Sequence, residues 1–372
     1  MTLREPGDDP GIDFALERFL RRRVGEGVTV RPLGGGHIHA SFVATSGEVA
    51  IVIQRLNEHV FPDLDAVEHN SALVTRTLRR VAEHGPRRDP LRDPRRRVLV
   101  PVASERDRLV ERDARGVAWR AFAYIADSHG VTSVTDALQA SRAAGAFGAF
   151  FRDLADLDAG LLRETIPRFH DTPHRLAALE AAIAADSAAR VVGAMPEIAF
   201  ARDRRPLGGR LMEALLAARL PLRATHNDAK VANVLFDDAT DEALCVVDLD
   251  TVMPGLAAWD VGDLVRSMAG DRAEDDPAPV TLRWPILEAL LRGWIGAAGP
   301  ALAAPERASL VDGALVITYE QGVRFLTDYL VSDRYYKAER AGQNLDRARA
   351  QFALLAALEH DEDRLRRLVA SA

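Results

Sequence analysis

The apolar pattern of the chain changes once, near residue 127, and this change limits the folds that the chain can adopt. Before that point, short apolar runs lie between glycine, proline and serine turns, which is typical of strands. These runs occupy residues 28–33, 41–45, 49–56, 98–102 and 117–125. After it, apolar residues recur every three or four positions, which predicts amphipathic helices. We therefore predict the α+β class, with a small, mostly antiparallel sheet lobe followed by a larger helical lobe.

The two lobes are predicted to be joined by a short hinge over residues 123–127. The N-terminal lobe covers residues 1–122 and contains one long helix, expected over 64–81. The C-terminal lobe covers residues 128–372. It contains helices around 147–157, 315–330 and 345–355 and one pair of strands near 234–248. A length of 372 residues agrees with two lobes, because single cores rarely grow so large.

Charge and cysteine content exclude several classes of protein. The net charge is -7, which disfavours nucleic acid or an anionic membrane surface as a partner. No apolar run reaches the roughly 18 residues of a membrane span, and the first residues lack the apolar core of a signal peptide. The single cysteine, Cys245, excludes an internal disulfide. We expect a cytoplasmic protein that binds neither nucleic acid nor membranes.

The segment over 225–250, THNDAKVANVLFDDATDEALCVVDLD, carries the residues best suited to chemistry. It is predicted to form an antiparallel hairpin with its turn over 237–242. The residue that begins the first strand then lies opposite the one that ends the second, which brings Asn233 and Asp248 together. Asp228 precedes them in a loop that can fold back. An amide oxygen and two carboxylates suit magnesium, which binds few protein ligands plus phosphate oxygens.

Neighbouring polar residues have simpler interpretations. The aspartates of the turn are explained as turn formers, namely Asp237, Asp238 and Asp241. His226 is interpreted as a structural residue that braces the loop rather than as a proton shuttle. Asp260 is interpreted as the cap of the following helix, with Asp263 three positions later as in a capping box.

The string HNDAKVAN followed by VVDLD resembles the H-x-D-x-x-x-x-N and V-D signatures of the aminoglycoside phosphotransferase and choline kinase superfamily. With CVVDLDTVMPGLAAWDVGD it is similar to one branch, the N-acetylhexosamine 1-kinases. The likeness extends over residues 28–358 and includes LGGGHIHASF, VIQRLNEHVF, WRAFAYI, ETIPRFHDTPHR and TYEQGVRFLTDYL. The resemblance implies a two-lobed, protein-kinase-like fold, ATP as the phosphoryl donor and Mg²⁺ as the metal.

The resemblance also implies roles for single residues. Asp228 matches the catalytic base, Asn233 and Asp248 match the metal ligands, and Asp260 matches a buried aspartate that braces the catalytic loop. A carboxylate that takes the hydroxyl proton is what phosphoryl transfer needs besides charge neutralisation. The N-terminal lobe is expected to bind the nucleotide. The predicted cofactor-binding residues are Gly34, Gly35, Gly36, Gln54, Arg55, Tyr124 and Ile125.

The N-terminal lobe departs from the superfamily pattern in one respect. Kinases of this superfamily carry a lysine or arginine late in the strand after the glycine loop, but no lysine occurs in the first 229 residues. Gln54 stands where the cation is expected, and Arg55 points to the other face by alternation. Either Arg55 reaches in through a bulge, or Gln54 takes the role with less charge. The N-acetylhexosamine kinases share this pair, so we do not interpret it as loss of activity.

The acceptor is predicted to bind near the helix over 315–330, where Glu320, Arg324 and Asp328 share a polar face. This face fits either a surface ladder of ion pairs or a sugar site at Arg324, flanked by Tyr329 and near Tyr335 and Tyr336. Lys230 is one of only two lysines, and lysine and arginine differ in geometry. The predicted substrate-binding residues are His37, Lys230, Arg324 and Tyr329.

These features predict an ATP-dependent kinase for a small sugar, specifically for the anomeric hydroxyl of an N-acetylhexosamine. A cationic acceptor needs a carboxylate-lined pocket, whereas residues 318–352 offer arginine, aromatic and amide groups. One alternative is a kinase of the same fold for an aminoglycoside, a methylthioribose-like sugar or an amino alcohol. A second is a non-catalytic nucleotide-binding protein, and a third is a nucleotide-sugar transferase, which would need a parallel nucleotide-binding sheet.

Overall fold

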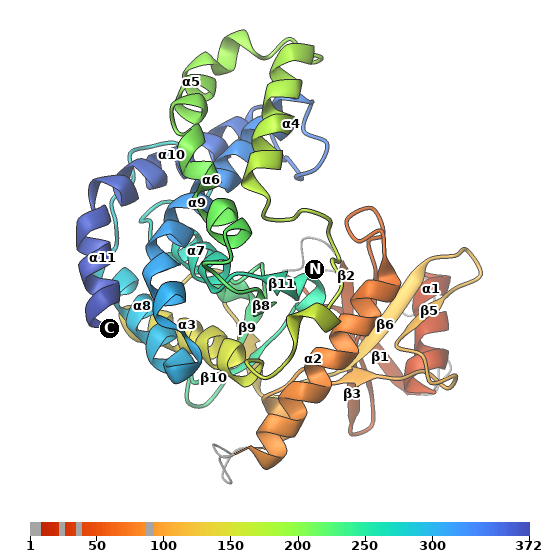
Figure 1. The fold of residues 1–372 in the computed structure, drawn as a ribbon. Helices are drawn as coiled ribbons and strands as arrows, with labels where there is room; N and C mark the ends of the chain where they lie inside the picture. Colours follow the sequence, from red (N-terminus) through yellow and green to blue (C-terminus); the bar gives the residue numbers. More distant parts are fainter. Residues whose placement is uncertain (1–8, 22–26, 35–38, 86–92) are drawn as a thin grey trace. The chain divides into compact units, whose positions relative to one another are not determined.

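The computed structural model describes residues 9–21, 27–34, 39–85 and 93–372 (Figure 1). The chain forms two compact units. The first comprises residues 1–132, 160–167 and 232–253, and the second comprises 133–159, 168–231 and 254–372. The first unit therefore includes three segments, 128–132, 160–167 and 232–253, that were predicted to belong to the C-terminal lobe.

The first unit is built on an antiparallel sheet in the order β1-β2-β3-β6-β4, with β5 also paired to β6. Its strands are β1 (Val28–Pro32), β2 (Ala40–Ser46), β3 (Val49–Arg55), β4 (Pro101–Val102), β5 (Val110–Arg112) and β6 (Ala118–Ala123). The predicted strands are all present, but the one over 98–102 is reduced to two residues. The three-residue strand β5 is too short to show a period and was not predicted.

Two helices of the first unit bury apolar residues against this sheet. Helix α1 (Pro10–Ala15) and the π-helical turn after it (Leu16–Leu20) form a core with the strands. The buried members of that core include Ile12, Leu16, Phe19, Ile51, Ile53 and Trp119. Helix α2 (Leu64–His84, orange in Figure 1) begins where Asp63 caps the backbone N–H of Ala66 at 2.9 Å. Its start agrees with the predicted helix, and its end lies three residues later.

A second, three-stranded sheet of the same unit has the order β10-β9-β7. Strand β7 (Ser128–Gly130) pairs with β9 (Val234–Asp237), which pairs with β10 (Ala243–Val246). The sequence analysis predicted the hairpin of β9 and β10 but not β7, which is again only three residues long. This sheet explains why the segment over 232–253 belongs to the first unit.

The second unit is helical. Helix α9 packs against α7, α10, α4, α6 and α11, and α3 packs along α8. The helices are α3 (Ala137–Asp153), α4 (Thr172–Ala185), α5 (Met195–Asp203), α6 (Arg205–Leu216), α7 (Ala257–Met268), α8 (Trp284–Ala298), α9 (Ala304–Leu330), α10 (Gln343–His360) and α11 (Glu362–Ser371). The short strands β8 (Arg223–Thr225) and β11 (Met253–Gly255) pair with each other. Within the described ranges, no helix combines the length and the apolar character that crossing a membrane requires.

Glycine allows two helices of this unit to approach closely. A Cβ at Gly262 of α7 would collide with the backbone of Gly313 in α9, and a Cβ at Gly313 would collide with the backbone of Ala258. Only glycine fits at such a crossing. Because α7 begins directly after the chain leaves the first unit, this contact fixes the position of Asp260 within the second unit.

Candidate active site

The hairpin of β9 and β10 carries the two predicted metal ligands at one end. The pair Val234 and Val246 is in register, and the backbone N–H of Val247 donates to the carbonyl oxygen of Asn233 at 2.9 Å. Asn233 therefore lies opposite Val247. The predicted partner, Asp248, is one position further along. The register shifts between Ala243 and Cys245, which is the signature of a β-bulge. Asp248 follows one residue later at the same end of the hairpin.

Asp248 has an unusual backbone. Its φ of 62° and ψ of 57° lie in the left-handed region, which costs a non-glycine residue about 1–2 kcal/mol. Such residues persist where the surrounding structure determines them, and they concentrate at functional sites. The short 3₁₀ turn Leu249–Thr251 begins directly after it. Asn233 ends another 3₁₀ turn (Val231–Asn233) and is 4% exposed.

The chemistry of these two side chains fits magnesium. Magnesium prefers oxygen ligands and is usually held by one or two carboxylates with substrate phosphates. An amide oxygen from Asn233 and a carboxylate from Asp248 supply that kind of donor set. Among the residues that the structure describes, no group of three or more His, Cys, Asp or Glu could hold a metal. A site that relies on phosphate oxygens does not need one.

Asp250, two residues after Asp248, is another carboxylate near the predicted ligands, but its side chain is buried and bonded within the protein. Its carboxylate is 2% exposed and both of its oxygens are engaged. The Arg120 guanidinium donates to both oxygens, at 2.7 Å from Nη2 to Oδ2, and His39 Nε2 lies 2.6 Å from Oδ2. Burial alone would raise the pKa of Asp250, but the charge and hydrogen bonds of Arg120 and the His39 contact hold it well below its usual value.

Arg120 is a buried cation next to the strand position where the superfamily lysine was expected. It lies directly across from Gln54 in the pairing of β3 and β6, and its Nε donates to Gln54 Oε1 at 2.9 Å. The Gln54 amide in turn donates to Ser41 Oγ at 2.9 Å. Strand β3 pairs regularly over its whole length, and Arg55 is exposed and 3.6 Å from Asp9. The prediction that Arg55 reaches inward through a bulge is therefore wrong.

Arg120, in the string WRAFAYI, was not predicted as a site residue. The signal was present, because Arg120 is a charged residue inside an otherwise apolar strand. A guanidinium that is only 5% exposed needs a buried partner. The sequence does not say which carboxylate this partner is, since Asp250 is 130 positions away.

The other predicted nucleotide contacts stay predictions. Gly34 follows β1, whereas Gly35, Gly36 and His37 lie outside the described residues. The Tyr124 hydroxyl accepts a hydrogen bond of 3.4 Å from Arg31, whose guanidinium lies 6.0 Å from the ring centroid. Ile125 is buried, and its carbonyl oxygen accepts a hydrogen bond of 2.6 Å from Ser128 Oγ.

Within the second unit, the loop of the predicted base is held by a buried aspartate. Asp260 accepts hydrogen bonds from the backbone N–H groups of His226, at 2.9 Å, and Asn227, at 2.7 Å. Helix α7 begins three residues earlier with Leu256 as its N-cap, so the interpretation of Asp260 as a helix cap is wrong. The bracing role implied by the resemblance is confirmed. Burial raises the pKa of the Asp260 carboxyl, which His226 and the two N–H donors oppose.

Further contacts fix the same loop. His170 Nε2 lies 3.0 Å from the Asn227 carbonyl oxygen, and Thr225 Oγ1 donates to Asn227 Oδ1 at 3.0 Å. A Cβ at Gly255 would collide with both Thr225 Oγ1 and Asn227 Oδ1, which requires glycine there. His226 is fully buried, with its ring edge-on to two phenylalanine rings. This placement agrees with the structural role predicted for it.

Asp228 follows this braced segment and is 22% exposed. Lys230 Nζ donates to Asp228 Oδ2 at 2.8 Å. The sequence analysis predicted Lys230 as a substrate contact, and the structure places it beside the predicted base. Both side chains reach solvent, which a base and a substrate-binding cation require.

The polar face of α9 is not a surface ladder of ion pairs, because two of its members are buried. Glu320 accepts from Thr172 Oγ1 at 2.6 Å and lies 2.9 Å from His170 Nδ1. Burial opposes the ionisation of Glu320, but His170 holds its pKa below the usual value. Asp328 accepts hydrogen bonds from several backbone N–H groups and one side chain. These donors belong to Arg334, Tyr335, Tyr336 and Asn344.

Arg324 lies among aromatic rings of the second unit. The centroids of Phe169, Tyr336 and Tyr335 lie 5.0, 5.6 and 5.9 Å from its guanidinium carbon. Tyr329, which was expected to flank it, instead packs on Arg190 at 4.7 Å. Phe169, in the string ETIPRFHDTPHR, was not predicted as a neighbour of Arg324.

A second guanidinium lies close to this cluster. Arg175 donates to the Phe169 carbonyl oxygen at 2.9 Å through Nη2. Burial and the positive charge of Arg324 lower the pKa of Arg175. The surroundings of Arg324 therefore combine two cations with aromatic rings.

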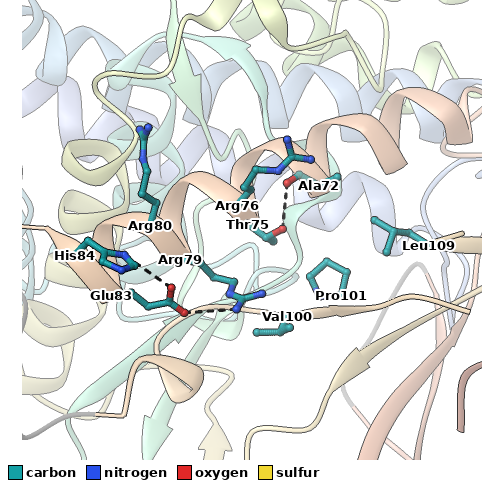
Figure 2. A pocket seen from close by; sticks show the side chains of 10 residues that line it. All are labelled: Ala72, Thr75, Arg76, Arg79, Arg80, Glu83, His84, Val100, Pro101 and Leu109. Carbon is teal, nitrogen blue, oxygen red and sulfur yellow. Dashed lines mark hydrogen bonds and ion pairs between the residues drawn. The ribbon is translucent and has the colours of Figure 1, made fainter. Parts of the chain in front are cut away.

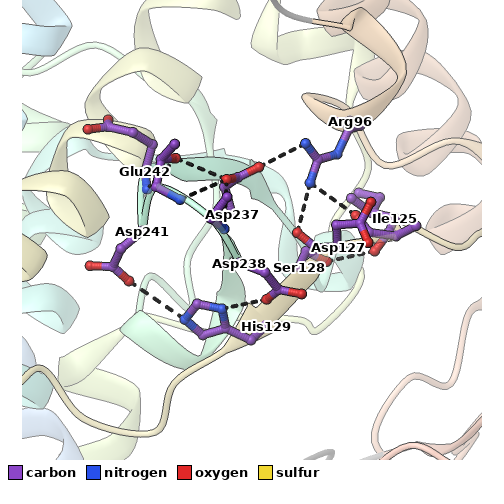
Figure 3. Close-up of polar contacts among 12 residues, drawn as sticks. Arg96, Ile125, Asp127, Ser128, His129, Asp237, Asp238, Asp241 and Glu242 are labelled. Atoms are coloured by element: carbon purple, nitrogen blue, oxygen red, sulfur yellow. Dashed lines mark hydrogen bonds and ion pairs between the residues drawn. The ribbon is translucent and has the colours of Figure 1, made fainter.

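Figure 3 shows a polar cluster where the β9–β10 turn meets the segment after β6. Arg96 Nη1 donates to Asp237 Oδ2 at 2.8 Å, and its Nη2 donates to the carbonyl oxygens of Ala126 and Asp127 at 3.0 and 2.8 Å. His129 Nδ1 lies 2.8 Å from Asp238 Oδ1. The hydrogen bond from Arg96, and then one from Thr240, lower the pKa of Asp237 from 3.8 to about 2.

We expect Arg96→Met to raise the pKa of Asp237 toward 3.8, because the largest cause of its depression is removed. The depressed value stabilises the fold above pH 3.8, and this contribution is lost as the pH falls through about 2. A ¹³C carboxyl titration by NMR measures the change. Arg95→Met is the control, since Arg95 pairs with Asp93 instead. An unchanged titration in Arg96→Met would contradict the assignment.

A hollow of about 410 Å³ lies beside α2 in the first unit (Figure 2). Arginines of α2 line it, and one of them, Arg79, pairs with Glu83 at 3.4 Å. No residue that the sequence analysis predicted for the site takes part in its wall.

Solved structures share this fold. A microcompartment-associated aminopropanol kinase has 16% identity and a TM-score of 0.63, covering 96% of this chain and 98% of its own. A spectinomycin phosphotransferase, solved with ADP and spectinomycin, has 13% identity and a TM-score of 0.60. The match covers 95% of this chain and 99% of that chain. A choline kinase from Cryptosporidium parvum has 13% identity and a TM-score of 0.53, covering 93% of each chain. The predicted two-lobed, protein-kinase-like α+β fold is confirmed.

The sequence comparison defines the family. A family model described as the phosphotransferase enzyme family, APH, matches residues 29–299, which is more than half of the chain. The predicted superfamily is confirmed, and the N-acetylhexosamine branch stays a prediction. With the braced loop at Asp228 and the hairpin that bears Asn233 and Asp248, the chain belongs to the phosphotransferase enzyme family.

Proposed function

We propose that this protein is an ATP-dependent kinase that phosphorylates the anomeric hydroxyl of an N-acetylhexosamine. The observation that carries the proposal is the loop braced by Asp260, which presents Asp228 beside Lys230 at 2.8 Å. The similar spectinomycin phosphotransferase was solved with ADP. A similar aminoglycoside 2′-phosphotransferase, with a TM-score of 0.55, was solved with GDP. These relatives support a purine nucleotide as the donor. We also propose that the enzyme acts in the cytoplasm, without nucleic-acid or membrane partners.

In the proposed mechanism, Asp228 orients the acceptor hydroxyl and takes its proton. The hydroxyl oxygen attacks the γ-phosphorus of ATP and forms the new O–P bond. The bond from phosphorus to the bridging oxygen breaks, and ADP leaves with the electron pair. An anomeric hydroxyl is more acidic than an ordinary alcohol, so a carboxylate is a strong enough base to take its proton. Lys230 is proposed to contact oxygen atoms of the substrate.

Asn233 and Asp248 would hold Mg²⁺. A bound magnesium ion supplies charge neutralisation on the phosphates. The strained backbone of Asp248 and the burial of Asn233 would fix the two oxygen ligands before nucleotide binds. Gly34, Gly35, Gly36, Gln54, Tyr124 and Ile125 remain proposed as nucleotide contacts.

The surroundings of Arg324 support a neutral acceptor. Two guanidinium groups, Arg324 and Arg175, lie close enough for one to lower the pKa of the other. A polycationic aminoglycoside or a protonated amino alcohol would be repelled there. Hydroxyl and acetamide oxygens can accept from a guanidinium, and sugar rings pack on aromatic faces such as Tyr335 and Tyr336. His37 stays a proposed substrate contact.

The test is ADP release with Mg-ATP and a panel of acceptors. We expect N-acetylglucosamine or N-acetylgalactosamine to give the highest rate, and kanamycin and choline to give little. Efficient phosphorylation of kanamycin, of aminopropanol or of choline would overturn the substrate class but keep the kinase. If no acceptor of the panel leads to ADP release, the non-catalytic alternative is favoured.

We expect Arg324→Ala to lower kcat/KM for the sugar by roughly 5- to 150-fold, or about 1–3 kcal/mol, the cost of losing a hydrogen bond from a charged group. Steady-state kinetics with the best sugar of the panel measures the loss. Arg204→Ala is the matched control, because Arg204 also stacks on a ring, Phe200 at 3.6 Å, and pairs with a carboxylate. A parental kcat/KM in Arg324→Ala would place the acceptor elsewhere.

A further inference from the structure

Four residues of the first unit form hydrogen bonds or ion pairs with the loop after Asp248. Its Asp250 carboxylate contacts Arg120 and His39. Thr165 Oγ1 donates to the Asp250 carbonyl oxygen at 2.6 Å. Two residues after Asp250, the Val252 carbonyl oxygen accepts a hydrogen bond of 2.9 Å from Asn70 Nδ2 of α2. Nothing in the proposed mechanism uses these contacts.

The contacts form a buried network with strict geometry. Arg120 makes a two-pronged hydrogen bond to Asp250 and a third hydrogen bond to Gln54 at 2.9 Å. The backbone N–H of Asn57 donates to His39 Nδ1 at 3.1 Å, which leaves His39 Nε2 to donate to Asp250. The network therefore fixes both the ring of His39 and the carboxylate of Asp250.

Stability alone is a poor explanation for this network. A buried ion pair loses about as much by desolvation as it gains by attraction, and apolar residues of the same volume often stabilise equally well. A fully satisfied buried network does fix one geometry of the backbone around it. The backbone next to Asp250 is the unusual one, because Asp248 holds φ 62° and ψ 57° only two residues away. A left-handed aspartate needs neighbours that determine it.

We propose that Arg120, Asp250 and His39 are positioning residues that hold Asp248 in the geometry for metal binding. The inference rests on the proposed function, in which Asp248 is a magnesium ligand. It also gives a role to the buried arginine that lies opposite Gln54. The ion pair of Arg120 with Asp250 connects strand β6 to the proposed metal-binding loop.

The test measures metal binding directly as well as activity. Mn²⁺ is titrated into the protein with the non-hydrolysable analogue AMP-PNP, and free Mn²⁺ is followed by electron paramagnetic resonance. Asp250→Asn keeps the shape but loses the charge that Arg120 grips. We expect it to weaken Mn²⁺ binding by about 10- to 100-fold, the usual loss when a residue that orients a ligand is changed. Circular dichroism and a thermal melt confirm that the variant is folded.

A matched control and a double mutant separate positioning from a general structural role. Glu58→Gln breaks the exposed two-pronged pair with Arg112, at 2.7 and 2.9 Å in the same unit, and should leave Mn²⁺ affinity unchanged. Because Asp250 acts through Asp248, adding Asp250→Asn to Asp248→Ala should change the remaining affinity by less than about twofold. Losses that simply multiply would contradict the inference.

Each further outcome has a defined meaning. Parental Mn²⁺ affinity in folded Asp250→Asn overturns the positioning role while the metal site stands. Parental affinity in Asp248→Ala instead overturns the proposed metal ligand. If Asp250→Asn does not fold, His39→Gln serves, because glutamine lacks the Nδ1 acceptor through which Asn57 fixes the His39 ring against Asp250. It should still weaken Mn²⁺ binding, and an unchanged affinity overturns the inference.

Discussion

Asp228→Asn is expected to lower kcat by about 10²- to 10⁴-fold, which is the usual contribution of a positioned general base. Asparagine has the same size and keeps one acceptor oxygen, but it cannot take the proton of the hydroxyl. The affinity for ATP should change only a few-fold, because the lost charge acts on the acceptor. Single-turnover kinetics separates the two effects, and nucleotide binding is measured by calorimetry.

The loop itself should survive this substitution. The hydrogen bonds that brace it run from the backbone of His226 and Asn227 to Asp260, and none of them involves the Asp228 side chain. Asp312→Asn is the matched control. Asp312 pairs with Arg366 at 2.8 Å on the surface of the same unit, and its loss should leave kcat near that of the parent. A kcat of Asp228→Asn within tenfold of the parent contradicts the base assignment.

Asp248→Ala is expected to remove activity through the metal. Charge neutralisation by a bound metal is worth several kcal/mol in the transition state, so the loss should be on the order of 10³-fold. Raising the Mg²⁺ concentration should restore part of the rate if the defect is binding. Mg²⁺ titration of the steady-state rate measures this defect.

Asp248→Gly sharpens this test, because glycine adopts φ 62° without strain. We expect this variant to melt no lower than Asp248→Ala and to be equally inactive. Asp238→Asn, in the turn of the same hairpin, is the control that should keep its activity. An active Asp248→Gly, or a crystal structure with nucleotide and Mg²⁺ in which Asp248 is more than one water from the metal, would falsify the ligand assignment.

The parts of the fold that the sequence predicted are those whose signal is local. The hairpin over 234–246 was predicted from two apolar runs and a turn rich in aspartate, and α2 from its helical period. The bulge between Ala243 and Cys245 was not predictable, since one extra residue leaves both runs unchanged. It shifts the register by one residue, so that Asn233 lies opposite Val247 instead of Val246, still one position short of the predicted partner Asp248.

The parts that the sequence did not predict depend on contacts between distant residues. The network of Arg120 and Asp250 joins positions 130 apart, and Glu320 meets His170 from 150 positions away. Helical spacing left open whether Glu320 belongs to a surface ladder of ion pairs or to a sugar site, because the period of the helix does not show which neighbour covers a polar face. The interpretation of Asp260 as a helix cap was wrong for a similar reason. Its place near a helix start fits a cap, but its partners come from another segment.

The most direct test of the account is the chemical identity of the product. Protein is incubated with Mg-ATP and N-acetylglucosamine or N-acetylgalactosamine, and the product is examined by ³¹P NMR and by a reducing-end assay. We expect a phosphorus signal coupled to the anomeric proton and a sugar that no longer reduces. A phosphosugar that keeps its reducing end, or phosphate transfer to kanamycin but to neither sugar, would contradict the account.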